Sequence, residues 1–250
     1  GMTEDDFQNK FLKIGYSKRK KGENASERGR PYIGRKGIGK LALLSCADKI
    51  VVISKIKNGQ YVGGLIDNSG LDRAITEDLV PSDYPLEEYD VSVFGEHTKV
   101  HEKGTIIYFE NIKEEIRNSF DFLRKTIALY FRFSLLDPSF SMFLNDVKIT
   151  LDDLDDLAKD TQFLWNINQL NDPYIKEKLM KIRDVKFRKQ EEVTKMNGNV
   201  KGFIASVKKP RHLKINSTDE KIGVDLFVNG RLREKDILNH IPTDRLAVSY

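Results

Sequence analysis

A glycine-rich, basic segment is the feature that most limits what this chain can fold into. Residues 34–40 have the sequence GRKGIGK and run directly into the apolar stretch LALL at residues 41–44. Glycines let a backbone approach a ligand closely and adopt positive φ. Successive N–H groups at the start of a helix attract anions. The pattern therefore predicts a phosphate-binding loop that opens a helix.

Two common nucleotide loops fit this segment incompletely. Gly34, Gly39 and Lys40 satisfy the P-loop spacing, but Leu41 stands where a Ser or Thr hydroxyl would hold Mg²⁺. Gly37, Gly39 and Ala42 satisfy a dinucleotide fingerprint. Both motifs follow a buried strand, whereas residues 26–31, SERGRP, are polar and interrupted by glycine and proline. Neither motif is favoured.

Charge is unevenly distributed along the chain. The totals, 42 basic and 38 acidic residues, nearly balance. Basic residues concentrate near the start, with KRKK at 18–21 and further Arg and Lys up to residue 40, while residues 152–156 are acidic. A local basic cluster suits either the phosphates of a nucleotide or a nucleic-acid backbone, and a solvated loop without a ligand is also compatible with it.

Composition excludes several other classes of protein. The chain has no apolar run near the ~20 residues of a membrane span and no signal-peptide pattern, so we expect a cytoplasmic protein without membrane contact. A single cysteine, Cys46, excludes an internal disulfide, and the four histidines lack zinc-site spacing. Both ends are expected to be cut from a longer protein, because Gly1-Met2 is typical of a tag-cleavage scar and the last residues are apolar.

Hydrophobic periodicity and turn residues predict an α+β fold with a mixed, mostly antiparallel sheet covered on one face by helices. Asn58-Gly59 and Asn145-Asp146 are expected to close two hairpins. Helices are expected within 3–16, from 41 onward and over 119–133; strands over 50–53, 61–66, 104–109, 200–207 and 223–228; and irregular structure over 67–103.

The segments around the glycines resemble a known superfamily. Residues 14–18, IGYSK, a basic loop, and residues 34–42, GRKGIGKLA, are similar to the lid and second glycine box of the GHKL ATPases, which include gyrase, heat-shock chaperones, histidine kinases and mismatch-repair ATPases. The first of these stretches is particularly similar to the Microrchidia branch. Gly104-Thr105 at a strand start looks like the family's Gly-Thr pair, and residues 227–231, FVNGR, look like the second domain of mismatch-repair ATPases.

The resemblance implies a fold and a domain order. The fold is an incomplete Bergerat-type ATPase sandwich, followed by the start of a transducer-like α/β domain. The expected divisions are a partial ATPase domain at 1–150 with a lid loop at 17–40, a charged helical connector at 151–195, and a partial transducer-like domain at 196–250.

The resemblance also implies a nucleotide site. The threonine of the Gly-Thr pair helps recognise adenine, the glycines approach the phosphates, and Lys18 reaches the terminal phosphate. The residues assigned to nucleotide binding are Met2, Lys18, Gly34, Arg35, Lys36, Gly37, Ile38, Gly39, Lys40 and Thr105.

In the same family a glutamate activates water, an asparagine four residues later holds Mg²⁺, and both precede a D-x-G-x-G-M motif whose aspartate reads adenine. Gly1-Met2 matches only the last two residues of that motif. No catalytic residue and no metal ligand is therefore assigned in this chain. Because a positioned base contributes about 10²–10⁴-fold, the 250-residue chain is expected to hydrolyse ATP very poorly. A turnover assay on the purified chain checks this, and robust hydrolysis would refute it.

The function expected from the resemblance is an ATP-binding conformational switch, inactive by itself, with ATP and Mg²⁺ as cofactors of the full-length protein. Its expected partners are the nucleotide, a DNA or protein client and a second copy of the chain. The alternative is a nucleic-acid-binding or scaffold module without ATP turnover.

Overall fold

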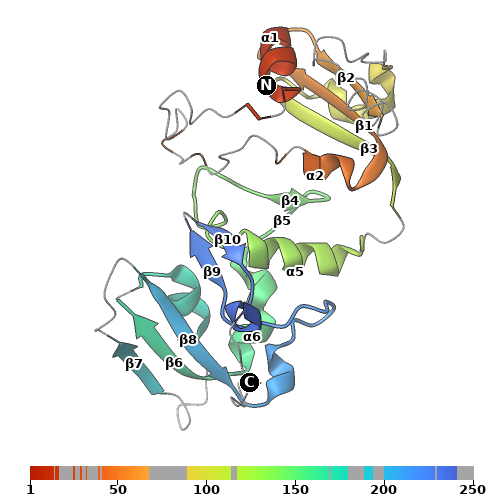
Figure 1. Cartoon of the computed structure of the whole chain (residues 1–250). Helices are drawn as coiled ribbons and strands as arrows, with labels where there is room; N and C mark the ends of the chain where they lie inside the picture. Colours follow the sequence, from red (N-terminus) through yellow and green to blue (C-terminus); the bar gives the residue numbers. More distant parts are fainter. Residues whose placement is uncertain are drawn as a thin grey trace. The chain divides into compact units, whose positions relative to one another are not determined.

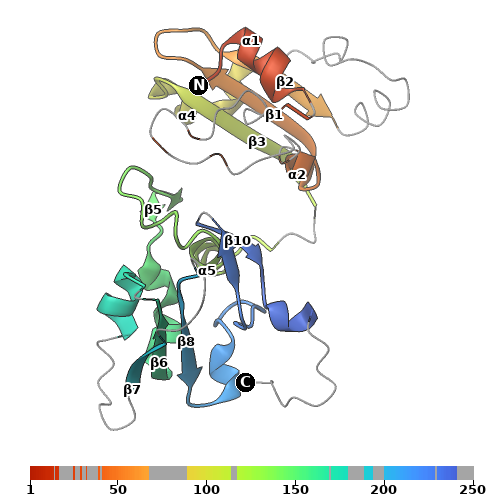
Figure 2. The same cartoon turned by 60° about the vertical axis from the view of Figure 1, so that its left-hand side comes forward.

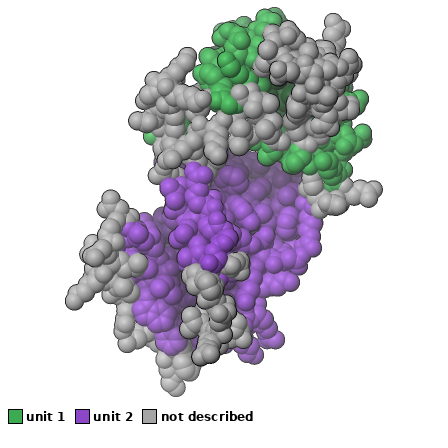
Figure 3. All heavy atoms as spheres, in the orientation of Figure 1, with its two compact units in different colours: residues 1–116 green, residues 117–250 purple. Residues whose placement is uncertain are grey.

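A computed structural model divides the chain into two compact units, residues 1–116 and 117–250 (Figure 3). The structure describes residues 1–13, 15–16, 25, 29, 32, 39, 41–67, 89–113, 117–168, 170–179, 189–193, 200–228 and 230–240. Short helices and mostly antiparallel strands make up both units, which confirms the predicted α+β class. Each unit is described by itself.

The first unit is built on a three-stranded antiparallel sheet in the order β2-β1-β3 (Figure 1). Its strands are β1 (Ala47–Lys55), β2 (Val62–Asp67) and β3 (Gly104–Ile112). The predicted hairpin at Asn58-Gly59 joins β1 to β2 and is confirmed. Asn58 has a φ of 60°, and the Gly59 N–H donates to the Ile56 carbonyl at 3.0 Å.

Central strand β1 is buried on both faces, because alternate residues of its β-branched run enter two different apolar clusters. Ile50 and Val52 pack with Phe7 on one face, and Val51 and Ile53 pack with Phe94 on the other. The first face is covered by α1 (Glu4–Asp6), η1 (Phe7–Phe11) and α2 (Leu41–Leu44); the Phe94 side carries η3 (Val91–Phe94), followed by α4 (Glu96–Lys99). The prediction had placed helices on one face of the sheet only. In the structure the short helix η3, which α4 follows, also lies on the Phe94 side.

The second unit begins with α5 (Phe120–Tyr130), which was predicted from its apolar face, and with a hairpin of β4 (Phe143–Leu144) and β5 (Val147–Lys148). The hairpin turn was predicted at Asn145-Asp146, and both residues have positive φ, 46° and 64°. This is the combination that a two-residue hairpin turn requires.

A three-stranded mixed sheet follows in the order β7-β6-β8, in which β6 is parallel to β7 and antiparallel to β8 (Figure 2). A two-stranded hairpin, β9-β10, comes after it. The elements are η4 (Leu151–Leu154), α6 (Asp155–Lys159), β6 (Thr161–Ile167), η5 (Ile175–Leu179), β7 (Lys189–Val193), β8 (Gly202–Val207), η7 (Pro210–Leu213), β9 (Leu226–Val228), β10 (Arg231–Glu234) and η8 (Ile237–His240).

The observed division of the chain differs from the expected boundaries near 150 and 195. Ala128 and Leu129 of α5 share one core with Leu164 of β6 and Leu179 of η5. Residues 117–150 therefore belong to the second unit, and residues 151–179 form part of its core instead of a connector. The acidic residues that suggested a connector form ion pairs with basic side chains of α5 and η5.

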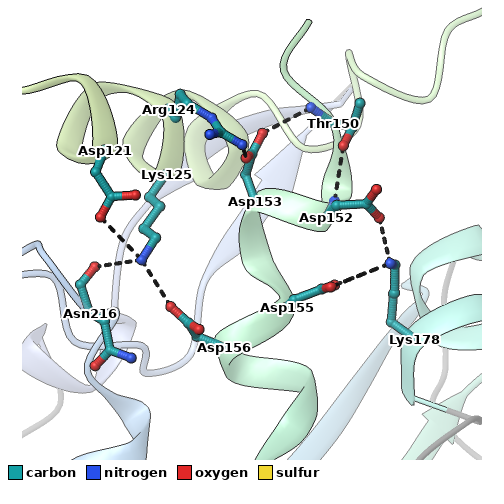
Figure 4. A network of polar contacts seen from close by, with 10 residues as sticks. All are labelled: Asp121, Arg124, Lys125, Thr150, Asp152, Asp153, Asp155, Asp156, Lys178 and Asn216. Carbon is teal, nitrogen blue, oxygen red and sulfur yellow. Dashed lines mark hydrogen bonds and ion pairs between the residues drawn. The ribbon is translucent and has the colours of Figure 1, made fainter. Parts of the chain in front are cut away.

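The acidic stretch at 152–156 lies within a network of ion pairs with two neighbouring helices (Figure 4). From α5, Arg124 pairs with Asp153, and Lys125 lies 2.9 Å from Asp156. From η5, Lys178 lies 2.5 Å from Asp152, and this carboxylate raises the pKa of Lys178 above its ordinary value. The network fixes η4 and α6 against α5 and η5.

Among the described residues, no helix is long and apolar enough to cross a membrane.

Candidate functional site

The hydroxyl of Ser54, near the end of β1, is the meeting point of two predicted site residues. It accepts a hydrogen bond from the backbone N–H of Met2 at 2.8 Å. It lies 3.0 Å from the Thr105 hydroxyl and donates to the Gly104 carbonyl, also at 3.0 Å. Ser54 is fully buried, at 0% exposure, whereas Thr105 is exposed. The structure thus brings residues 2 and 105 together through a residue that the sequence prediction did not select.

Strand pairing explains why these groups meet. Ser54 and Thr105 are directly opposite each other in the antiparallel β1–β3 ladder. Opposite residues of such a ladder place their side chains on the same face, about 4.5–5.5 Å apart at Cβ. Because Ser54 alternates in phase with Ile50 and Val52, this is the face that α1, η1 and α2 cover.

The N-terminal segment is held at this face by a helix cap and by apolar contacts. Thr3 caps α1: its hydroxyl accepts from the Asp6 N–H at 3.2 Å, and the Asp6 carboxylate accepts from the Thr3 N–H at 3.3 Å. Lys10 pairs with the same carboxylate and, with Thr3, holds the pKa of Asp6 below its ordinary value. The Met2 side chain packs against the cluster that contains Phe7.

Residue 1 lies directly on the backbone of β1. A Cβ at Gly1 would be 1.9 Å from the Lys55 carbonyl oxygen, closer than any real contact. A residue with a side chain would have to shift the backbone here.

Beyond Thr105 the same face of β3 presents apolar surface. Strand alternation places Ile107 and Phe109 in line with Thr105. Ile107 is 37% exposed, and Phe109 packs against the Phe7 cluster. A hydroxyl next to exposed aliphatic surface suits a flat heterocycle that carries polar groups on its edge.

Most of the predicted phosphate loop lies outside the described residues. This applies to Lys18, Gly34, Arg35, Lys36, Gly37, Ile38 and Lys40. Gly39 is described: its carbonyl accepts from the Ala42 N–H at 3.2 Å, and a Cβ there would meet nothing within 4 Å. The helix expected to follow is confirmed as α2, a single turn of four residues.

Ser54 itself carried little signal in the sequence. It ends a β-branched run, where a small polar residue is ordinary. Its partners are 50–52 residues away, so only a correct strand register would have revealed its role.

One family of known proteins matches the first part of the chain. Residues 1–88 match the family described as histidine kinase-, DNA gyrase B-, and HSP90-like ATPase. This match supports the GHKL superfamily. It covers Met2, Ser54 and the glycine segment, and it ends before Thr105.

The whole chain is also similar to a putative type II restriction enzyme, HgiDII, of Herpetosiphon aurantiacus, at 30% identity over 258 aligned residues. The alignment covers 100% of this chain, which spans 38% of the length of that relative. No solved structure gave a significant match to the chain.

Proposed function

We propose that this chain binds ATP on the helix-covered face of the β2-β1-β3 sheet, with the adenine next to Thr105 and the phosphates at residues 34–40. The observation that carries the proposal is the convergence of Met2 and Thr105 on the buried Ser54 hydroxyl. These two residues were selected separately, from two motifs 103 positions apart, and two hydrogen bonds through the Ser54 hydroxyl connect them.

The described residues that flank the lid loop, residues 17–40, support the same placement of the phosphates. Phe11 and Leu12 precede the loop and Leu43 follows it, and all three pack against the cluster of Ile50 and Val52. The described residues that flank the loop in the sequence therefore pack on the face that carries Thr105. This packing supports our placement of the phosphates near that face.

The finer parts of the proposal come from the family resemblance. We infer a Microrchidia-like and mismatch-repair-like ATPase in which nucleotide binding, with Mg²⁺, drives a conformational switch. Its partners would be a DNA or protein client and a second copy of the chain. Within this proposal the described residues supply the base-binding half, and Mg²⁺ would be held together with the phosphates.

Replacing Thr105 by valine tests the proposed base contact. The change keeps the shape of the side chain but removes the hydroxyl, so we expect ATP to bind about 5–15-fold more weakly, as for the loss of one hydrogen bond. Titration calorimetry on the purified chain measures the affinity. Thr98→Val is the matched control, since the Thr98 hydroxyl donates to Gly95 at the start of α4. Equal affinities of the two variants would contradict the proposed site.

A second candidate function is DNA binding, which is favoured by the similarity to a putative restriction enzyme over the full chain. The basic residues up to position 40 would then contact the DNA backbone. Counterion release predicts an affinity that falls steeply with salt. DNA binding that is equally strong with and without ATP and Mg²⁺ would favour this candidate over the nucleotide switch.

A further inference from the structure

The buried Ser54 hydroxyl has as many hydrogen-bond partners as its chemistry allows. A serine hydroxyl carries one proton to donate and two lone pairs that accept. Its three partners are the Met2 N–H, the Gly104 carbonyl oxygen and the Thr105 hydroxyl, at 2.8, 3.0 and 3.0 Å. Ser54 is 0% exposed, so solvent water does not take the place of these partners.

Only one direction of the protons satisfies all three contacts. The Met2 amide can only donate, so it occupies one lone pair of Ser54. The Gly104 carbonyl can only accept, so it takes the single Ser54 proton. Thr105 is left with the second lone pair of Ser54 and must donate its own proton to it. In the reverse arrangement, the Gly104 carbonyl would face a Ser54 lone pair at 3.0 Å with no proton between them.

We propose that Ser54 is a positioning residue that turns the Thr105 proton inward, so that Thr105 presents only hydrogen-bond acceptor lone pairs to a bound base. Ser54 touches no ligand itself in this arrangement. The proposal rests on the proposed function, because it concerns the base that lies next to Thr105.

The consequence is a preference between purines. An outward acceptor pairs with a donor, such as the 6-amino group of adenine. It repels the 6-oxo group of hypoxanthine or guanine, because two acceptors then face each other. The discrimination between 6-amino and 6-oxo purines therefore depends on the Ser54 hydroxyl, which contacts Thr105 and not the base.

The test compares the affinities of the 250-residue chain for ATP and for inosine triphosphate, which differ at position 6 of the purine. We expect the wild-type chain to bind ATP at least about 10-fold more tightly, as for one hydrogen bond gained against one repulsive contact. In Ser54→Ala the Thr105 hydroxyl is free to rotate and to donate, so the preference should fall to about 2-fold or less. Thr105→Val should lose the preference as well, and adding Ser54→Ala to it should change nothing further.

Ser54→Cys replaces only the hydroxyl oxygen by sulfur and should give an intermediate preference, since sulfur is a weak donor and acceptor. It also provides the measurement if Ser54→Ala fails to fold, which circular dichroism would show. If Ser54→Ala and Ser54→Cys weaken both nucleotides by the same factor, Ser54 is merely structural and the inference is overturned, while the proposed function stands. If the wild-type chain binds neither nucleotide, the proposed function is overturned and the inference with it.

Discussion

Replacing Arg132 by methionine is expected to lower the free energy of unfolding of the second unit by about 3–5 kcal/mol, the usual cost of removing one partner of a buried ion pair. Arg132 and Asp172 are both buried, at 7% and 1% exposure, and their side chains are 2.6 Å apart. Burial lowers the pKa of Arg132, and the Asp172 carboxylate opposes this shift. Without the guanidinium, Asp172 would be left as an uncompensated buried charge.

The surroundings of Arg132 make methionine an informative replacement. The guanidinium lies 5.0–5.3 Å from the ring centres of Phe133, Tyr174 and Phe203, which is within the range of cation–π attraction. Methionine preserves contact with these rings through its sulfur. The expected loss therefore reports on the charge more than on packing.

Urea unfolding followed by circular dichroism measures the effect. Lys99→Met is the control, since the Lys99–Glu96 pair is exposed and such pairs contribute about 0–1 kcal/mol. A double variant, Arg132→Met with Asp172→Asn, should recover part of the stability because the orphaned charge is gone. It should not recover all of it, since the hydrogen bond between the Arg132 guanidinium and Asp172, at 2.6 Å, stays lost. If Arg132→Met costs no more than the control, the pair does not stabilise the unit.

Local signals in the sequence were sufficient for the hairpins and for the central strand. Asn145 and Asp146 tolerate positive φ, and the turn between β4 and β5 uses both of them in that conformation. The β-branched run at 50–53 became the core of β1. These elements depend on a few neighbouring residues, so periodicity and turn chemistry identify them.

Contacts between residues far apart in the chain could not be recognised from local sequence signals. Residues 151–179 looked like a charged connector because their ion-pair partners, among them Arg124 and Lys125, lie 29–31 positions earlier in the chain. Leu164 and Ile175 become core residues only when α5 and β8 pack against them. Sequence periodicity describes one element at a time, and the boundary at 116 results from contacts between elements.

The candidate site shows the same difference between local motifs and long-range contacts. Family resemblance selected Met2 and Thr105, and the structure connects them. It could not select Ser54, because the role of Ser54 comes from the strand register that places it opposite Thr105. The assigned loop residues, apart from Gly39, lie outside the described part of the chain and stay predictions.

Replacing Phe7 by alanine is expected to be the most damaging single change in the first unit. Phe7 is 2% exposed, stacks on Phe11 with ring centres 5.4 Å apart, and packs against Ala47, Ile50 and Val52 of β1. Removing a buried phenylalanine side chain typically costs about 3–5 kcal/mol, from lost burial and from the cavity that remains. Urea unfolding measures the loss. Phe143→Ala is the matched control, because Phe143 is 60% exposed and its truncation should change stability by about 0.5 kcal/mol or less.

The effect of Phe7→Ala should extend to the candidate site, because Phe7 anchors the segment that begins with Met2. If η1 is less firmly packed, the hydrogen bond from the Met2 N–H to the Ser54 hydroxyl should be weaker. Through Ser54, this bond joins the N-terminal segment to Thr105. At a urea concentration where the variant is still folded, hydrogen exchange at the Met2 and β1 amides should be faster, and ATP affinity should fall more than in Phe143→Ala. If ATP affinity were unchanged while the free energy of unfolding dropped by several kcal/mol, the N-terminal segment would be structural only. In that case the base-binding surface would have to be formed without Met2.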